Sequence, residues 1–309
     1  MGRLYQPCSP PPEIRNQLLQ DRLNRRQCMS NDEHFSWGKY APKKKGLFLR
    51  FLIAVGLGRG SIRAKILKTW KEKFGNLLDI NVRGINYRLN LDDNVIDCKI
   101  FASSIIYDKK ELNYLKKACQ GGVFVDIGAN TGYYSLVLAH EACCEVIAIE
   151  PNPPTINRLK FNVEINSDLK EKITIIPMGV GEDGEFELYS GEDLGGASLH
   201  GSLFEKPNNK VTIQTKPLFD ILTKQNIKHV DSLKIDVEGM EDYALGPFFE
   251  KAPFQMWPKC IVIEYDHQHM WKIDLLNILM DKGYIEVSRS SGNVTLQLQK
   301  KAQAICIPR

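Results

Sequence analysis

The sequence predicts an α/β fold with a doubly wound, mostly parallel sheet that closes with an antiparallel hairpin. Two observations support this prediction. From Glu111 onward, short apolar runs alternate with helical patterns, which is typical of βαβ units. Near the carboxyl end, "YIEVS" and "VTLQLQ" are separated only by "RSSGN", a link too short for a parallel crossover. We therefore expect these last two strands to pair antiparallel at the edge of the sheet.

The chain before this alternation differs in composition from the rest. Residues 1–45 are rich in Pro, Arg, Asn and Gln and predict a partly disordered basic arm, with one helix over about 12–26. Residues 46–78 predict an amphipathic helical extension that Gly56, Gly58 and Gly60 break into a hairpin. Over 81–106 the apolar residues recur with period two, and "INVRGINYRLNL" predicts a β-hairpin that turns near Gly84.

The alternating region resolves into a series of elements. The helices show apolar residues every three to four positions, and the strands are β-branched runs bounded by Gly, Pro, Asn or Asp. We expect helices over 110–119, 132–140, 153–165, 217–225, 240–249 and 270–282, and strands over 123–127, 145–149, 173–176, 185–189, 211–215, 232–237, 260–264, 284–288 and 293–298.

Charge is unevenly distributed along the chain. The net charge is +4, but residues 1–75 hold 16 lysines and arginines against five acids, whereas residues 76–309 hold 25 against 32. A basic arm therefore precedes an acidic body. Such an arm indicates either attraction to phosphates or anionic lipid, or a solvated helical segment.

The cysteines and apolar runs indicate the compartment. The eight cysteines include no CxxC pair and no Cys/His ligand spacing, so neither zinc nor a disulfide framework is indicated. Residues 1–20 lack the apolar core of a signal peptide, and the run "GLFLRFLIAVGLG" is too short to span a bilayer. We expect a cytoplasmic protein whose basic arm makes peripheral contact with a membrane.

The stretch "VFVDIGANTGYYSLVLA" combines an apolar strand that ends at Asp126, a glycine turn and an apolar helix. Gly128 and Gly132 let the backbone pass close to a bound molecule and point amides at it. The spacing differs from the dinucleotide fingerprint G-x-G-x-x-G, which argues against an NAD enzyme. An acid just before the first glycine disfavours a pyrophosphate and suits a cationic ligand.

The next strand, "EVIAIEPNP", ends in Glu150. A carboxylate at the tip of this strand can accept hydrogen bonds from both hydroxyls of a ribose. The alternative is a structural acid at a helix N-terminus, with Pro151 forming the turn.

Four segments read in order carry a family resemblance: "DIGANTGYYS", "IEPNPPTINRLKFNVEIN", "GGASL" and "LKIDVEGME". This series resembles the FkbM family of class I S-adenosylmethionine (SAM)-dependent methyltransferases over roughly residues 80–299. The resemblance implies a Rossmann-like, seven-stranded sheet in a domain at 79–309. It also implies SAM as cofactor and methyl transfer to a hydroxyl, so we expect a carbohydrate or glycolipid acceptor.

The resemblance also implies which residues contact the cofactor. The methionine portion of SAM would be held by Asp126, Gly128, Asn130 and Gly132, with Tyr133 as a further cofactor-binding residue. Glu150 would hold the ribose. The adenine would be lined by Met178, Gly179 and Val180.

The stretch "SLKIDVEGMEDY" places four carboxylates at the end of a strand that a parallel sheet should bury. Lys234, Asp236 and Glu238 share one face, so they should lie near the carboxyl end, where ligands bind. We predict that Asp236, or secondly Glu238, accepts the proton of the acceptor hydroxyl. Lys234 either keeps Asp236 ionised or is a buried counter-ion, and Glu241 and Asp242 are expected to cap the following helix.

The fifth strand ends in "IVIEYDHQHMW", which brings further polar side chains to the same edge. In one mechanism, His267 or His269 is the base and Glu264 orients it. In another, the carboxylates of both strand ends bind Mg²⁺. The plain alternative is a solvated polar loop. Catalysis by a base without a metal is the default expectation, with the catalytic candidates Asp236, Glu238, Glu264 and His267.

Two further readings stay open. The loop "GGASLHGS", residues 195–202, either closes over the acceptor through Ser198 and His200 or is a plain connection. The alternative function is a nucleic-acid methyltransferase that uses the basic arm to bind phosphates. Against it, "EPNPPT" follows the second strand and lacks the aromatic residue of the amino-methyltransferase motif. That motif follows the fourth strand, where "KIDVEG" stands here, so nucleic acid is not the expected partner.

Overall fold

The computed structural model describes residues 36–43, 46, 60–102, 107–191, 196–199 and 209–299. The chain divides into two compact units, Met1–Lys39 and Tyr40–Arg309. In the first unit, residues 36–39 form a turn in which the Lys39 amide donates to the Ser36 carbonyl at 3.4 Å. The predicted helix over 12–26 and the predicted breaks at Gly56 and Gly58 lie outside the described residues.

In the second unit, a helix, a two-stranded hairpin and a short helix precede the main sheet. They are α3 (Gly60–Phe74), β1 (Leu77–Val82), β2 (Ile85–Asn90) and α4 (Val95–Ala102). β1 and β2 pair antiparallel around Arg83 and Gly84, whose φ angles are 57° and 89°. A two-residue turn with positive φ at both positions matches the twist of the strands. The predicted hairpin near Gly84 is therefore confirmed.

The period-two reading of residues 81–106 is wrong beyond β2, because α4 occupies 95–102. Its first turn is fixed by Asn94, whose side-chain Oδ1 accepts a hydrogen bond from the Asp97 amide at 3.1 Å. Such a side-chain bond at a helix start competes with extended backbone. Asn94 followed three residues later by an acid was the sequence signal for this helix.

The central sheet has seven strands in the order β11-β12-β10-β9-β3-β4-β5. β12 pairs antiparallel with both β10 and β11, and the other pairs are parallel. This arrangement confirms the Rossmann-like, doubly wound sheet with a closing antiparallel hairpin. The strands are β3 (Val123–Ile127), β4 (Glu145–Ile149), β5 (Ile173–Ile176), β9 (Ser232–Ile235), β10 (Cys260–Glu264), β11 (Tyr284–Arg289) and β12 (Asn293–Leu298).

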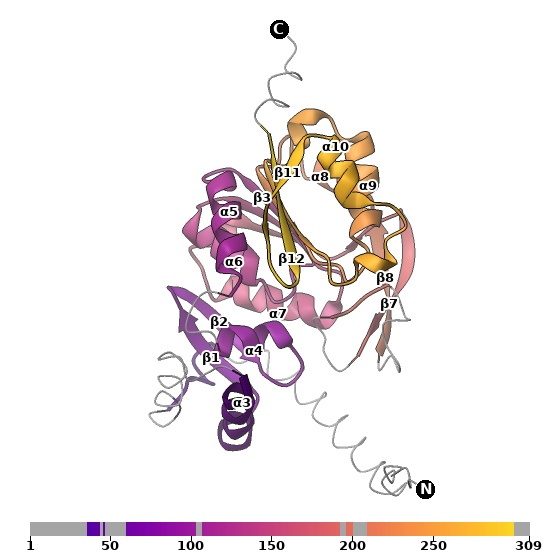
Figure 1. Cartoon of the computed structure of the whole chain (residues 1–309). Coiled ribbons are helices and arrows are strands. Elements are labelled where there is room, and N and C mark those ends of the chain that lie inside the picture. Colours follow the sequence, from indigo (N-terminus) through magenta and orange to yellow (C-terminus); the bar gives the residue numbers. More distant parts are fainter. Residues whose placement is uncertain are drawn as a thin grey trace, which may run out of the picture. The chain divides into compact units, whose positions relative to one another are not determined.

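Helices cover both faces of this sheet (Figure 1). On one face, α5 (Lys109–Cys119), α6 (Tyr133–Glu141) and α7 (Pro153–Glu164) bury a core shared with the hairpin and with α3 and α4. On the other face, α8 (Leu218–Lys224), α9 (Glu241–Lys251) and α10 (Leu275–Asp281) bury a second core. Because side chains alternate along a strand, Phe124 belongs to the first core and Val125 to the second.

A small second sheet stands beside the first, with β6 (Gly179–Val180), β8 (Asn209–Lys216) and β7 (Gly184–Ser190) in that order. Two predicted boundaries are corrected. The strand expected over 232–237 ends at Ile235, and the helix expected over 270–282 begins only after Asp274, whose side chain accepts from the Asn277 amide.

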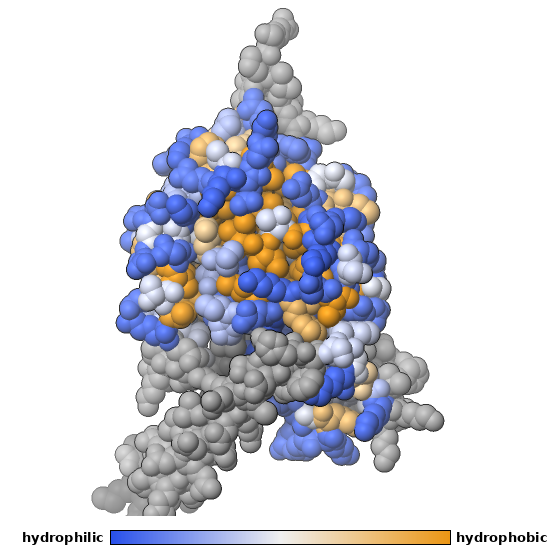
Figure 2. Space-filling model, turned by 180° about the vertical axis from the view of Figure 1, so that it is seen from behind, coloured by the Kyte–Doolittle hydropathy of each residue, from blue (hydrophilic) through white to orange (hydrophobic). Residues whose placement is uncertain are grey.

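Figure 2 shows the face opposite to that of Figure 1, where hydrophilic residues surround an apolar region in the middle of the view. In the part of the chain that the structure describes, no helix is both long and apolar enough to cross a membrane.

A buried ion pair attaches the hairpin to the domain. Arg88 makes two hydrogen bonds to Asp79, of 2.8 and 2.9 Å, and both side chains are almost fully buried. The guanidinium also lies 4.2 Å from the ring centroid of Phe161 in α7. This pair therefore joins the two hairpin strands to each other and to the helix beneath them.

We predict that Asp79→Ala destabilises the protein by about 3–5 kcal/mol, because it leaves a buried guanidinium without its counter-charge. Urea unfolding followed by circular dichroism measures the loss. Glu164→Ala is the matched control: it removes an exposed ion pair with Lys170 and should change the midpoint little. Equal midpoints for the two variants would contradict the role given to Arg88.

Candidate functional site

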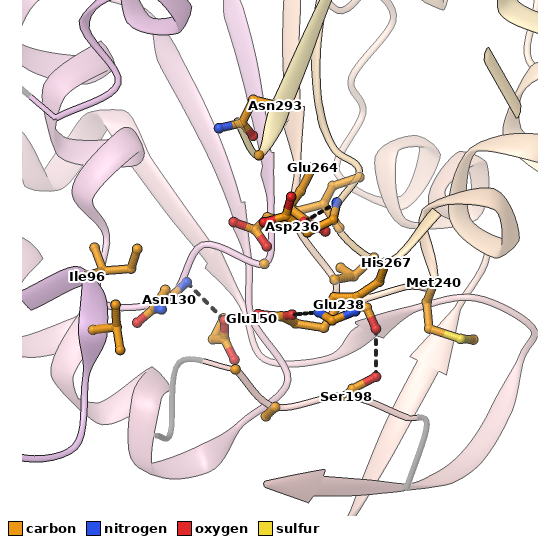
Figure 3. A pocket seen from close by; sticks show the side chains of 18 of the residues that line it. Ile96, Asn130, Glu150, Ser198, Asp236, Glu238, Met240, Glu264, His267 and Asn293 are labelled. Carbon is orange, nitrogen blue, oxygen red and sulfur yellow. Dashed lines mark hydrogen bonds and ion pairs between the residues drawn. The ribbon is translucent and has the colours of Figure 1, made fainter. Parts of the chain in front are cut away.

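A cavity of about 670 Å³ lies at the carboxyl ends of the central strands. Residues that follow β3, β4, β9 and β10 form much of its wall, and Figure 3 shows their side chains around the opening. In open α/β sheets, ligands bind at this edge where the strand order reverses, which here is between β3 and β9. The volume is typical of a small-molecule site.

The glycine loop does not offer free amides to a ligand. All five backbone amides of residues 128–132 donate within the protein: two to the Ile149 carbonyl, one to the Glu150 carboxylate, one to the Asn130 side chain and one to the Ala129 carbonyl. The expectation that this loop points amides at a bound molecule is therefore wrong. The glycines of the loop instead allow its backbone to pass close to neighbouring groups.

Gly128 is required by close packing of two loops. Its φ is +76°, and a Cβ at this position would lie 1.9 Å from the backbone oxygen of Asp236. No side chain fits there, so the loop after β3 and the loop after β9 touch through their backbones. This contact holds Asp236 beside the glycine loop.

Glu150 lies in the cavity wall and is 7% exposed. Its Oε2 accepts from the Asn130 amide and its Oε1 from the Asn152 amide, both at 2.9 Å. Burial raises the pKa of Glu150 to about 7, and the nearby Asp126 and Asp236 charges add to the rise. Because each carboxylate oxygen has two lone pairs, both oxygens can still accept a ligand hydroxyl.

The other predicted cofactor residues divide into two groups. Met178, Gly179 and Val180 line the cavity beside Gly128, Asn130 and Glu150. Asp126, Gly132 and Tyr133 do not line it. Asp126 is buried and accepts from the Ser135 hydroxyl at 2.6 Å, and the Tyr133 hydroxyl donates to the Tyr107 carbonyl at 2.8 Å. Of these three residues, Tyr133 contacts a lining residue, Tyr107.

Lys234 is the buried cation of this region. Its side chain is 6% exposed, its Nζ lies 2.9 Å from Oδ2 of Asp236, and it lies 4.9 Å from the ring centroid of Tyr134. Burial opposes the charge, but the carboxylates of Asp236, Asp126 and Asp108 outweigh it and raise the pKa of Lys234. The ammonium therefore stays charged among three acids.

Asp236 and the pair Glu238–His267 face the cavity from neighbouring strand ends (Figure 3). Nε2 of His267 lies 3.1 Å from Oε2 of Glu238. The predicted partner of His267 was Glu264, so the orienting acid is instead Glu238. Glu238 has a φ of 53°, a conformation that non-glycine residues adopt mainly at turns and functional sites.

The loop before β8 reaches the same place. The Ser198 hydroxyl donates to the Glu238 carbonyl at 2.8 Å, and residues 196–199 line the cavity. The structure thus places Ser198 against the acidic loop after β9. His200 lies outside the described residues.

Glu264 and Asn293 form a buried polar corner of the cavity. Glu264 is 9% exposed, and its Oε1 accepts from the Asp266 amide at 2.6 Å. Burial, with the charges of Asp236 and Glu241, raises the pKa of Glu264 to about 9. At neutral pH this group therefore holds its proton, which disfavours it as the general base.

Glu241 and Asp242 have structural partners, and Asp242 caps the helix as predicted, because its Oδ1 accepts from the Tyr243 amide in the first turn of α9 at 2.9 Å. Glu241 accepts from the amide of Val237 and from the indole of Trp271, at 3.0 and 2.8 Å. Asp242 accepts from the Lys272 amide at 2.7 Å. Both acids therefore join the loop after β9 to the loop after β10.

Within the described residues, no three His, Cys, Asp or Glu side chains converge as a metal site would require. The carboxylates of Asp236, Glu238 and Glu264 share the cavity wall without forming such a group. This geometry gives no support to the magnesium alternative. His269 is exposed and does not line the cavity.

Among the parts of the site that sequence reasoning missed, two are important. Asn94, just before α4, donates to Oδ1 of Asn130 at 2.7 Å, and Asp97 accepts from the Thr131 hydroxyl at 2.9 Å. These contacts brace the glycine loop, and the cap pattern of α4 could have revealed them. The second part is the turn between β11 and β12, residues 290–293. Only tertiary pairing brings this turn to the cavity.

Residues 126–286 match the methyltransferase FkbM domain. This match covers more than half of the chain and includes all of β4, β5, β9 and β10, the end of β3 and the first half of β11. A comparison with curated proteins finds no match.

Solved structures give weaker likenesses. TrmK of M. capricolum, in complex with S-adenosyl-homocysteine, is 13% identical, with 62% of this chain and 68% of that chain covered and a TM-score of 0.35. TYW2 of P. horikoshii, in complex with MeSAdo, is 17% identical, with 77% and 83% covered and a TM-score of 0.37. An RNA methyltransferase from Salinibacter ruber is 13% identical, with 63% and 92% covered and a TM-score of 0.34. Likenesses of this size support no statement about substrate.

We predict that Glu264→Gln makes stability less dependent on pH. Because the folded pKa of Glu264 is raised from 4.5 to about 9, the folded state keeps a proton that the unfolded chain releases. The free energy of unfolding of the wild type should therefore fall between pH 5 and 9, with a slope from this group of up to about 1.4 kcal/mol per pH unit. Urea unfolding at several pH values should show a shallower fall in the variant. Parallel curves would mean that Glu264 is ionised in the folded protein.

Proposed function

Because the chain belongs to the FkbM methyltransferase family and is a SAM-dependent methyltransferase, we propose that it methylates a hydroxyl oxygen of a carbohydrate or glycolipid. The observation that carries this proposal is the position of Asp236. Its carboxylate faces the cavity beside the glycine loop, at the point where the strand order reverses.

The cavity wall fits an adenosyl cofactor. Met178 and Val180 supply apolar surface for a base, and Glu150 supplies a buried carboxylate with lone pairs for the two ribose hydroxyls. The acids around the opening suit a positively charged sulfur. Glu150 and Met178 are therefore the residues we expect to hold SAM.

SAM supplies a methyl group on a sulfonium, which makes the methyl carbon electrophilic. As the oxygen–carbon bond forms, the carbon–sulfur pair of electrons goes to sulfur and the hydroxyl proton must leave. Asp236 accepts this proton in our proposal, and an ion pair with the buried ammonium of Lys234, 2.9 Å away, holds the carboxylate in position. Alignment of the hydroxyl by the cavity wall supplies the remaining acceleration.

Oxygen is favoured over nitrogen for a chemical reason. A hydroxyl is a weak nucleophile until a base begins to take its proton, and this cavity holds a carboxylate and a carboxylate–imidazole pair. The Pro-Pro-aromatic motif of amino-methyltransferases does not stand after β9, where the chain reads "KIDVEG".

The proposed acceptor is polyhydroxylated because polar side chains from the loop after β10 and from the turn between β11 and β12 line part of the cavity. Asp266, Ser290, Ser291 and Asn293 line this part of the cavity with carboxylate, hydroxyl and amide groups. Such groups pair with hydroxyls and provide little apolar surface for a steroid or a phenol.

We predict that the purified protein transfers labelled methyl from SAM to the glycan or glycolipid fraction of a cell extract. The product should be a methyl ether, which survives mild alkali and is recognised by the carbon-13 shift of its methyl group. Label that alkali releases would indicate an ester, and label on nitrogen in the RNA or DNA fraction would overturn the proposal. Glu150→Ala is the control that should lose transfer by losing SAM.

We predict that Asp236→Asn lowers the rate of transfer by about 10²–10⁴-fold, because the amide cannot accept the proton. The affinity for S-adenosylhomocysteine, measured by calorimetry, should change little. His267→Gln should cost less than about tenfold, and transfer should survive thorough chelation. If His267→Gln were the more damaging change, the pair Glu238–His267 would be the base instead.

A further inference from the structure

Two polar side chains at the outer end of the sheet are buried without complete hydrogen bonding. Glu264 ends β10 and Asn293 begins β12, and the two residues pair directly across the antiparallel ladder. They are 9% and 8% exposed, and both line the cavity (Figure 3). Directly opposite residues of such a ladder place their side chains on the same face, within contact distance.

Each of these side chains has an oxygen with no hydrogen-bond partner among the described residues: Oε2 of Glu264 and Oδ1 of Asn293. Leaving a buried polar atom unpaired costs about 1–3 kcal/mol. The usual explanation for such atoms in a cavity wall is a ligand or water that completes their bonds. Both residues line the proposed acceptor site.

The chemistry of the two groups restricts what can complete them. Glu264 holds its proton at neutral pH, so its hydroxyl donates, whereas the Asn293 oxygen accepts. A phosphate would be repelled by Asp236 and Glu238 beside them, and an aromatic ring would satisfy neither atom. A hydroxyl both donates and accepts and is the group that satisfies both.

Glu264 and Asp236 stand at the ends of neighbouring strands, which fixes how far apart they lie. β9 and β10 are parallel neighbours in which Ile235 pairs with Ile263. Asp236 and Glu264 are the next residues on the two strands, so they lie side by side. Neighbouring strands lie about 4.8 Å apart. Two hydroxyls on adjacent carbons can span this gap, one at each acid.

We propose that Glu264 and Asn293 bind a second hydroxyl of the acceptor, next to the hydroxyl that is methylated at Asp236. The enzyme then selects acceptors that carry neighbouring hydroxyls, as the rings of sugars and cyclitols do. This inference rests on the proposed function and extends it, because methyl transfer to an isolated alcohol would need neither residue.

The first test uses the whole protein and an acceptor that need not be identified. A cell extract is treated with periodate, which cleaves carbon–carbon bonds between neighbouring hydroxyls, and the periodate is then quenched and removed. Labelled transfer from SAM to oxygen should fall at least about tenfold relative to the untreated extract. Undiminished transfer to treated extract would overturn the inference while the proposed function stood.

The second test changes the two residues. Glu264→Leu and Asn293→Leu should each lower kcat/KM for the untreated extract by about ten- to a hundredfold, chiefly through KM. Glu264→Gln carries both a donor and an acceptor and should recover most of this loss. Glu286→Gln, an exposed change on the same hairpin, should match the wild type.

The outcomes separate the two proposals. If the wild type transfers no label to oxygen in untreated extract, the proposed function fails, and this inference fails with it. If it transfers label but the leucine variants keep the KM of the wild type, the pair binds only water and the inference alone is wrong. Affinity for S-adenosylhomocysteine shows that each variant is folded, and the periodate test does not depend on any variant.

Discussion

The structure depends on one buried positive charge. Lys234 projects from β9 beside Asp126 of β3, and its ammonium balances Asp126, Asp236 and Asp108, which come from three separate segments. A buried charge without a counter-charge is far more costly than a buried pair. The segments that carry these acids are therefore held close to Lys234. The same charge forms an ion pair with the Asp236 carboxylate at the cavity beside the glycine loop.

The wall around this charge is completed by internal hydrogen bonds rather than by groups left free for ligands. The amides of the glycine loop are all satisfied, and Asn94 and Asp97 brace the loop from α4. The contribution of the loop to cofactor binding is therefore shape and close approach. Polar recognition falls to side chains such as Glu150, whose pKa of about 7 reflects its burial.

The edge of the sheet has a charged part and a neutral part. Around β9, Lys234 forms an ion pair with Asp236, and Glu238 contacts His267. Around β10 and β12, no comparable cation faces Glu264 among the described residues, so burial and the neighbouring acids keep it protonated. Two carboxylates on adjacent strand ends thus differ in their surroundings, because Asp236 pairs with a lysine whereas Glu264 is buried near other acids. Such a division suits a site where one hydroxyl loses a proton and another is only bound.

The sequence by itself determined the topology and the carboxyl edge as the place of the site. Apolar periodicity, the short link between the last strands and the series of motifs are local properties, and they predicted the sheet and the residues at its strand ends. The tertiary structure decided what each acid does. It assigned Glu238 rather than Glu264 to His267, gave Glu241 and Asp242 partners in the next loop, and brought Asn293 beside Glu264. A carboxylate's charge and partners depend on burial and on residues distant in sequence, and a one-dimensional pattern contains neither.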